Sequence, residues 1–159
     1  MSHSDSLAVP LFVRDQIGAQ TEDHFTREGI YQAFADMGIV YGSYFQRISY
    51  VQRRTNMALS WLSNYDGIFL GWSGLMDCSF QAGMAISIGE RNDSLMPYSL
   101  GLLMLHKPLP LQGLGSVFVL TKKLSSYRTN ITIFNEEYSP LLSVFDLGVK
   151  PSNLQQSGV

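Results

Sequence analysis

The chain has 159 residues and a mass of 17.8 kDa, which suits one domain with a sizeable core. Charged residues make up 15% of it, against about 25% in typical soluble domains, so we expect part of its surface to be covered by a second copy or a partner. The net charge of −2 and the scattered basic residues exclude a nucleic-acid-binding face, which needs concentrated Lys and Arg.

The ends of the chain differ in character from its middle. Residues 1–22 have little periodicity and are expected to form an arm or an edge strand, residues 23–151 form one domain, and the Ser- and Gln-rich residues 152–159 form a flexible tail. Residues 1–10 have no basic start and no apolar run of the kind a signal peptide needs, so we expect none, and apolar runs are interrupted well before the roughly 18 residues that span a bilayer. Together with a single cysteine, these features indicate a cytoplasmic protein with no membrane segment.

A short amphipathic helix is expected from about residue 27 to 37. Thr26 is a good N-cap residue, and the apolar residues Ile30, Phe34 and Met37 recur on one face of the helix. Gly38 then stands where a left-handed residue ends many helices.

Strand patterns follow this helix. Residues 45–51 and 57–62 flank the polar stretch 52–56, which predicts a hairpin. Four more strands are expected later in the chain: 98–106, 116–121, 129–135 and 141–149. Apolar and polar residues alternate at 130–133 and 142–144, as in half-buried strands.

Between these strands lies a predicted helix of a different kind, from residue 73 to 88. Its apolar residues occupy nearly every side of the helical wheel, so we expect it to be buried almost all round. Asp77 and Gln81, one turn apart, are its only strongly polar side chains. The pattern predicts an α+β fold, and a curved antiparallel sheet wrapped around a buried helix, the hotdog arrangement, satisfies both the helix and the strands.

Four segments, in order, resemble a known family. They are YQAFADMGIVYGSYFQ (31–46), LMDCSFQ (75–81), MPYSLGLLMLHKPLP (96–110) and ITIFNEEYSPLLSVFDLGVKP (131–151). Together they resemble the C-terminal hotdog of the double-hotdog polyketide synthase dehydratase domain, here as a stand-alone single hotdog. The resemblance covers roughly residues 24–151.

The chain also departs from that family's pattern. The family's first hotdog supplies a catalytic histidine in a His-x-x-x-Gly-x-x-x-x-Pro motif, which this sequence lacks. Ser43 replaces the proline of the Tyr-Gly-Pro signature, and Trp72–Ser73 replaces a His-Pro pair before the catalytic helix.

The resemblance implies roles for five residues. Asp77 would be the catalytic acid, and an apolar environment would help its carboxyl group to keep a proton. Gln81 would orient that carboxyl group or the substrate hydroxyl, while Tyr41 and Phe45 would line an acyl tunnel. The helix N-terminus near Gly74 would polarise the thioester carbonyl through free N–H groups.

His24 and His106 are the candidates for a second acid or base, although each is more simply an exposed histidine at the end of an element. Cys78 points about 100° away from Asp77 on the wheel and is expected to be a packed side chain. No cluster has metal-ligand spacing, and no Gly-rich nucleotide loop follows a strand. We therefore expect no metal and no cofactor, with the substrate carried on a phosphopantetheine arm.

Three functions remain open from the sequence. The first is a polyketide-biosynthesis dehydratase that acts on a carrier-protein-bound β-hydroxyacyl or enoyl thioester. The second is a double-bond isomerase or cyclase, for which a single carboxyl group suffices, with a thioesterase as a variant. The third is a non-catalytic hotdog partner of a synthase assembly. The resemblance implies an acyl carrier protein or synthase module as partner, and an unsealed sheet edge predicts a homodimer.

Overall fold

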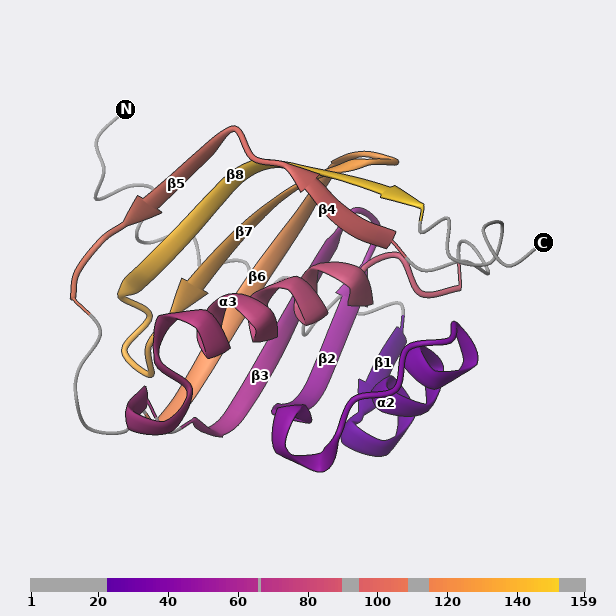
Figure 1. Cartoon of the computed structure of the whole chain (residues 1–159), viewed down its shortest axis with the longest axis horizontal. Helices are drawn as coiled ribbons and strands as arrows, with labels where there is room; N and C mark the ends of the chain where they lie inside the picture. The colour runs from indigo at the N-terminus through magenta and orange to yellow at the C-terminus, as the bar shows by residue number, and fades with distance from the viewer. Residues whose placement is uncertain (1–22, 66, 90–94, 109–114, 152–159) are drawn as a thin grey trace.

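A curved antiparallel sheet wraps around one long helix (Figure 1). The computed structural model describes residues 23–65, 67–89, 95–108 and 115–151, so the predicted arm and tail lie outside the described residues. Helix α3 (Gly67–Ala85) crosses the concave face of the sheet, and the shorter α2 (Arg27–Asp36) packs beside its β1–β2 end. The expected α+β hotdog fold is confirmed.

The sheet has eight strands, and all of their pairings are antiparallel. In chain order they are β1 (Asp23–Thr26), β2 (Ile48–Arg54), β3 (Met57–Tyr65), β4 (Leu95–Ser99), β5 (Leu102–Leu105), β6 (Gly115–Ser125), β7 (Arg128–Phe134) and β8 (Pro140–Pro151). Their spatial order is β1-β2-β3-β6-β7-β8-β4, with β5 also paired to β8. Strand β1 therefore forms one edge of the sheet, while β4 and β5 together form the other.

Helix α2 forms where the sequence predicts it. The Thr26 side chain accepts a hydrogen bond from the Gly29 N–H at 3.2 Å, which is an N-cap. Ile30 and Phe34 are fully buried on the apolar face. Gly38, just past the end of the helix, has a φ of 90°, which glycine adopts without strain.

The β2–β3 hairpin has a tighter turn than the sequence indicates. The polar stretch 52–56 was expected to be a loop, but β2 continues to Arg54 and leaves only Thr55 and Asn56 between the strands. Asn56 takes a left-handed conformation with a φ of 63°, which asparagine tolerates. The polar residues extend the strand because Arg53 finds partners beneath the sheet.

One predicted strand, 98–106, is divided into β4 and β5. The break lies at Gly101, whose N–H donates to the Phe145 and Asp146 carbonyl oxygens at 3.2 and 3.3 Å. A Cβ at Gly101 would lie 2.8 Å from the Cβ of Asp146, so the chain can approach β8 there only without a side chain.

The main core lies between α3, α2 and the concave face of the sheet. Gly83 marks how closely α3 approaches β7, since a Cβ there would lie 3.0 Å from the Ile131 side chain. The convex face has a second cluster of buried residues from β3, β6 and β7: Leu59, Phe118, Leu120 and Phe134. No helix in the described ranges has the length and hydropathy of a membrane span.

Arg53 fixes the C-terminal end of α3 to the sheet. Its guanidinium donates to the Ala85 and Ile88 carbonyl oxygens at 3.0 and 2.7 Å, where helix carbonyls lack intrahelical partners. It also forms an ion pair with Asp23 on β1, which lowers the pKa of that carboxyl group. One side chain therefore joins the edge strand, β2 and the helix that contains Asp77.

We predict that Arg53→Met lowers the free energy of unfolding by about 2 kcal/mol, because buried helix carbonyls lose a charged donor. Arg54→Met is the matched control, since the described residues give the Arg54 side chain no hydrogen bond or ion pair. Urea unfolding measures both. Equal losses in the two variants would show that Arg53 does not anchor the helix.

Candidate active site

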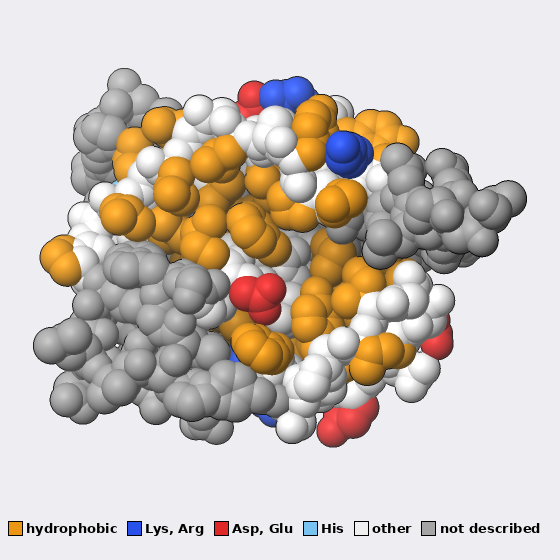
Figure 2. Space-filling view, viewed as in Figure 1, with side chains coloured by type: hydrophobic (Ala, Val, Ile, Leu, Met, Phe, Trp, Pro, Cys, Tyr) orange, Lys and Arg blue, Asp and Glu red, His pale blue; other side chains and the backbone are white. Residues whose placement is uncertain are grey.

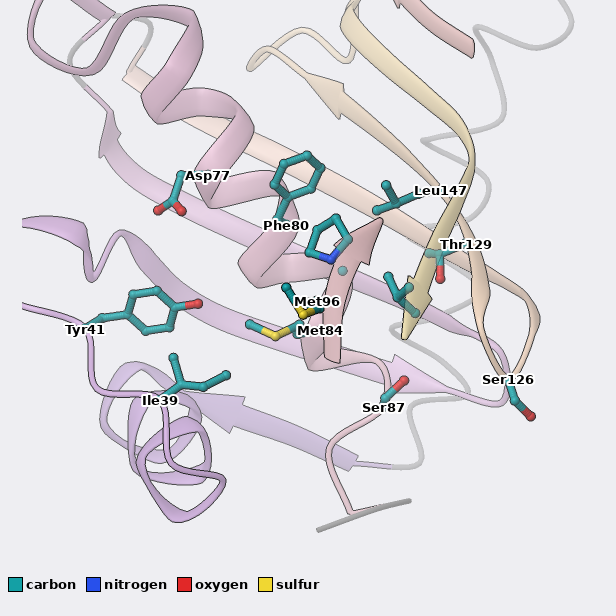
Figure 3. A pocket seen from close by; sticks show the side chains of 13 residues that line it. Ile39, Tyr41, Asp77, Phe80, Met84, Ser87, Met96, Ser126, Thr129 and Leu147 are labelled. Atoms are coloured by element: carbon teal, nitrogen blue, oxygen red, sulfur yellow. The ribbon is translucent and has the colours of Figure 1, made fainter. Parts of the chain in front are cut away.

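A cavity of about 220 Å³ lies beside α3 (Figure 3). Its walls come from the loop after α2, from α3, from β4, from the β6–β7 turn and from β7 and β8. The lining residues are Ile39, Tyr41, Asp77, Phe80, Gly83, Met84, Ser87, Met96, Pro97, Ser126, Thr129, Leu147 and Val149. Most of them are apolar, so the few polar groups identify where chemistry could occur.

Asp77 lies at one end of this cavity. On α3, Asp77, Phe80 and Met84 share the face that lines the cavity, as residues three and four apart do, while Leu75 and Cys78 are buried in the core. Asp77 is half-buried. The helix expected to be buried all round therefore leaves one stripe free for a ligand.

A buried hydrogen-bond network holds the Asp77 carboxyl group. The Gln81 Nε2 donates to Asp77 Oδ2 at 2.9 Å and to the Phe45 carbonyl oxygen at 3.1 Å. The Tyr31 hydroxyl donates to Gln81 Oε1 at 2.8 Å and accepts from the Ile48 N–H at 3.0 Å. Gln81 is fully buried.

The network has only one consistent direction. The Phe45 carbonyl oxygen can only accept, so the end of the Gln81 amide that faces it must be the nitrogen, and the Tyr31 hydroxyl donates to the oxygen at the other end. The amide nitrogen then faces Asp77 and makes Oδ2 an acceptor. The amide makes no hydrogen bond to the other carboxyl oxygen, Oδ1.

Tyr41 lies at the same end of the cavity as Asp77 (Figure 3). Burial, and next the negative charge of Asp77, raise its pKa to about 12, so its hydroxyl keeps its proton and can donate to a ligand. Burial and the charge of Asp77 also raise the pKa of the neighbouring Cys78 thiol to about 12. Cys78 is 1% exposed, so it is a packed thiol and a poor nucleophile.

Two of the expected site residues occupy positions other than those implied. The Phe45 side chain is 45% exposed and does not line the cavity, but its carbonyl oxygen fixes Gln81. Gly74 was expected at the start of the helix, yet α3 begins at Gly67, so the Gly74 N–H lies inside the helix and is not one of the free first-turn groups. This corrects the proposed polarising role of Gly74.

Neither candidate histidine lines the cavity. His24 lies on β1, where its ring stacks on Tyr50 with 5.6 Å between the ring centres. His106 follows β5, and its Nε2 is 2.8 Å from the Ser143 hydroxyl. Ser143 pairs with Thr132, whose neighbours Ile131 and Ile133 point into the main core, so His106 reaches the opposite, convex side.

Sequence reasoning missed Tyr31 and the hydroxyl groups of Ser87 and Thr129. Tyr31 was only the first residue of the family-like segment 31–46, and nothing in the sequence indicates that it lies beside Gln81, fifty positions away. Ser87 and Thr129 come from α3's C-terminal end and from β7, and only the tertiary fold brings them to one cavity. No group of three His, Cys, Asp or Glu residues in the described part of the chain could hold a metal ion.

Comparison with models of known protein families identifies the family of the chain. The family model described as the polyketide synthase dehydratase N-terminal domain matches residues 12–117, more than half of the chain. The chain belongs to the polyketide synthase dehydratase family. The resemblance described above was to the C-terminal hotdog, so the two agree on the family but differ on the half. A comparison with curated protein sequences gave no match.

Solved dehydratase domains share the fold of this family member. The dehydratase domain of RzxB from Pseudomonas fluorescens is 25% identical, with a TM-score of 0.68 over 83% of this chain and 50% of that one. Two variants of the CurK dehydratase of the curacin polyketide synthase are each described as an inactive mutant. The variant with a histidine changed to phenylalanine is 19% identical to this chain, with a TM-score of 0.71 over 89% of this chain and 52% of that one. The variant with an aspartate changed to asparagine is 20% identical, with a TM-score of 0.70 over 87% of this chain and 52% of that one. The chain thus spans about half the length of these domains.

We predict that Tyr31→Phe lowers the free energy of unfolding by about 1–3 kcal/mol, because it leaves Gln81 Oε1 and the Ile48 N–H buried without a partner. Tyr50→Phe is the control, since the structure gives the Tyr50 hydroxyl no hydrogen bond within the described residues. Chemical denaturation of both variants decides the matter. A Tyr31→Phe protein as stable as the Tyr50→Phe protein would contradict the network.

Proposed function

We propose that the chain is a dehydratase-like enzyme that acts on a β-hydroxyacyl or enoyl thioester by acid/base chemistry at Asp77. One observation supports this most strongly. Asp77 faces an apolar cavity with one carboxyl oxygen engaged by Gln81, which is the arrangement a general acid needs to present the other oxygen to a ligand.

In dehydration, a base removes the proton from Cα and the hydroxyl on Cβ leaves as water with a proton from the acid. The Cα–H and Cβ–O bonds break, and a carbon–carbon double bond forms. Asp77 Oδ1 would supply the proton that the leaving hydroxyl needs, while Gln81 holds the carboxyl group in place. The Tyr41 hydroxyl, which stays protonated, would donate to the thioester carbonyl as negative charge develops there.

The base for the Cα proton is not evident among the described residues that line the cavity, none of which is a histidine. This favours a second candidate function. A double-bond isomerase or a cyclase moves one proton between carbons, and a single carboxyl group can both take it and return it. For dehydration, the base would have to come from outside the described residues, for example from another chain or another domain.

The solved relatives support Asp77 as the catalytic group. The CurK dehydratase loses activity both when a histidine and when an aspartate is replaced. We propose that this chain corresponds to the half that provides the aspartate, the C-terminal hotdog, because Asp77 lies on the central helix with Gln81 one turn later. The substrate would arrive on the phosphopantetheine arm of an acyl carrier protein, within a synthase module or beside one.

We predict that Asp77→Asn lowers turnover of β-hydroxyacyl or enoyl pantetheine thioesters by at least about 100-fold, the usual worth of a general acid. Mass spectrometry and NMR distinguish the reactions, since dehydration loses water whereas isomerisation and cyclisation leave the mass unchanged. Asp36→Asn, at an exposed position on α2, is the control. Wild-type turnover by the Asp77→Asn protein would refute the site. Absence of turnover by the wild-type chain, with stable binding to a synthase module, would favour a non-catalytic partner.

We further propose that a second copy of this chain covers the β4–β5 edge. All four residues of β5 are exposed, and residues 95–105 contain no charged side chain. Figure 2 shows hydrophobic side chains gathered over this part of the sheet. An uncharged apolar edge pairs with another strand unless it is protected. The opposite edge, β1, is protected, because it carries the Asp23–Arg53 ion pair.

The β4–β5 edge also contributes residues to the cavity. The cavity volume of about 220 Å³ is below the roughly 300–1,000 Å³ of sites that enclose a ligand, and Met96 and Pro97 of β4 are among the residues that line it. A second hotdog across this edge would add further walls to the cavity.

We predict a homodimer by size-exclusion chromatography with light scattering at micromolar concentration. Leu105→Lys should shift it to monomer, because the substitution places a charge on the edge. Leu124→Lys should leave the dimer intact, since Leu124 is similarly exposed (54% against 58%) but lies near the β6–β7 turn. A wild-type monomer, or a dimer that survives Leu105→Lys, would contradict this interface.

A further inference from the structure

Two hydroxyl groups in the core have no hydrogen-bond partner among the described residues. They are Ser60 Oγ on β3 and Thr121 Oγ1 on β6, and both residues are fully buried. Buried polar groups are paired in the large majority of cases, because an unpaired one loses its bonds to water and gains nothing in return. These two hydroxyl groups therefore indicate a partner that the described part of the chain does not supply.

Both hydroxyl groups face the concave side of the sheet, which α3 covers (Figure 1). Side chains alternate between the two faces of a strand, so residues two apart share a face. Ala58 and Leu62 flank Ser60 in this way, and both belong to the main core. Val119, two residues before Thr121, belongs to the same core. The two hydroxyl groups therefore lie between the sheet and the helix.

The strand register sets the separation of the two groups. Thr121 pairs with Ala58, two residues before Ser60, so Ser60 and Thr121 are diagonal neighbours on adjacent strands. Diagonal neighbours are roughly 7–8 Å apart, and their Cβ atoms are somewhat closer. A direct O–H···O bond requires about 2.8 Å between the oxygens, whereas one bridging water spans about twice that distance. The diagonal spacing therefore fits a bridge better than a direct bond.

The surroundings of the two hydroxyl groups are apolar. Val51 on β2 pairs with Ser60, and it is buried in the main core. Ile131 on β7 pairs with Thr121, and it is buried in the same core. None of these neighbours is charged, and an ion here would lose its hydration without gaining a counter-charge. The partner must therefore be neutral as well as small, and water meets both requirements.

The buried side chains of α3 above this part of the sheet are small. Gly83 marks the place where the helix touches Ile131, the β7 neighbour of Thr121. Ala82, next to Gly83, and Cys78, about one turn earlier, are buried in the same core. A water molecule needs only about 10–15 Å³ of probe-occupied space, and small side chains at this level of the helix favour a gap of that size.

We propose that one water molecule is bound between α3 and the sheet and bridges Ser60 Oγ and Thr121 Oγ1. Each hydroxyl can donate or accept, so one water can satisfy both. Two protein partners lie within the range of about two to four that buried waters have. The water belongs to the support of the helix that carries Asp77 and not to the cavity, whose lining includes neither hydroxyl. It does not depend on the proposed function.

A crystal structure of the wild-type chain tests the bridge directly. We expect one water oxygen within about 2.5–3.0 Å of both hydroxyl oxygens. A direct hydrogen bond between Ser60 and Thr121, or a gap between them without ordered density, would overturn the proposal.

Thermal unfolding of variants gives a second, independent test. Ser60→Ala and Thr121→Val should each lower the Tm by about 2–6 °C, because each deprives the water of a partner and leaves the other hydroxyl poorly satisfied. The double variant should lose less than the sum, because the second substitution removes the group that the first one left unpaired.

Thr132→Val is the matched control, since Thr132 bonds to Ser143 on the convex side and its effect should add to that of Ser60→Ala. Additive losses from Ser60→Ala and Thr121→Val would show that no molecule links the two groups. Single variants with a higher Tm than the wild type would show that the hydroxyl groups are simply unpaired. Either result overturns the proposal.

Discussion

A fully buried amide must satisfy both of its ends, and Gln81 does so with groups from three parts of the chain. Tyr31 from α2, the Phe45 carbonyl from the loop before β2, and Asp77 from the previous turn of α3 surround it. The order of donors and acceptors in this network commits one Asp77 oxygen, Oδ2, to the amide, while Asp77 itself lines the cavity. The geometry of the candidate site therefore depends on how α2 and the loop after it pack against α3.

This constraint explains why the structure anchors α3 so firmly. Arg53 holds the C-terminal carbonyls of the helix, and Gly83 allows its close approach to β7. A helix free to slide or rotate would carry Asp77 away from Tyr41 and would expose Gln81. On the other side, Met96 and Pro97 of β4 line the cavity, and all four residues of the neighbouring β5 are exposed. This exposed apolar edge is the surface that we propose a second copy covers.

The sequence was sufficient for those features that depend on local patterns. The cap at Thr26, the buried face of α2 and the antiparallel strands all arise from periodicity and from single residues with strong preferences. The starting point of α3 was not predictable, because the stretch from Gly67 to Ser73 has glycines and a tryptophan that favour no single boundary. The division of one strand at Gly101 was equally hidden, since it comes from close contact with β8 and not from local preference.

The residues of the candidate site also fall into two groups, those that local sequence patterns predict and those that only tertiary packing brings together. Asp77 and Gln81 stood out as the only polar side chains on an apolar helix, so their pairing was predictable from one turn of separation. Tyr31, the Phe45 carbonyl, Ser87 and Thr129 join the site through tertiary packing, which no spacing in the sequence reveals. The exposure of His24 and His106 agrees with their simpler interpretation, and neither lines the cavity, so no base for dehydration is identified among the described residues.

The most direct test is a crystal structure with a non-hydrolysable β-hydroxyacyl pantetheine analogue. We expect the β-hydroxyl to lie within hydrogen-bonding distance of Asp77 Oδ1, with the Gln81 amide still bonded to Oδ2 and to the Tyr31 hydroxyl. An analogue bound away from Asp77, or a carboxyl group turned so that both oxygens face the Gln81 side, would contradict the account.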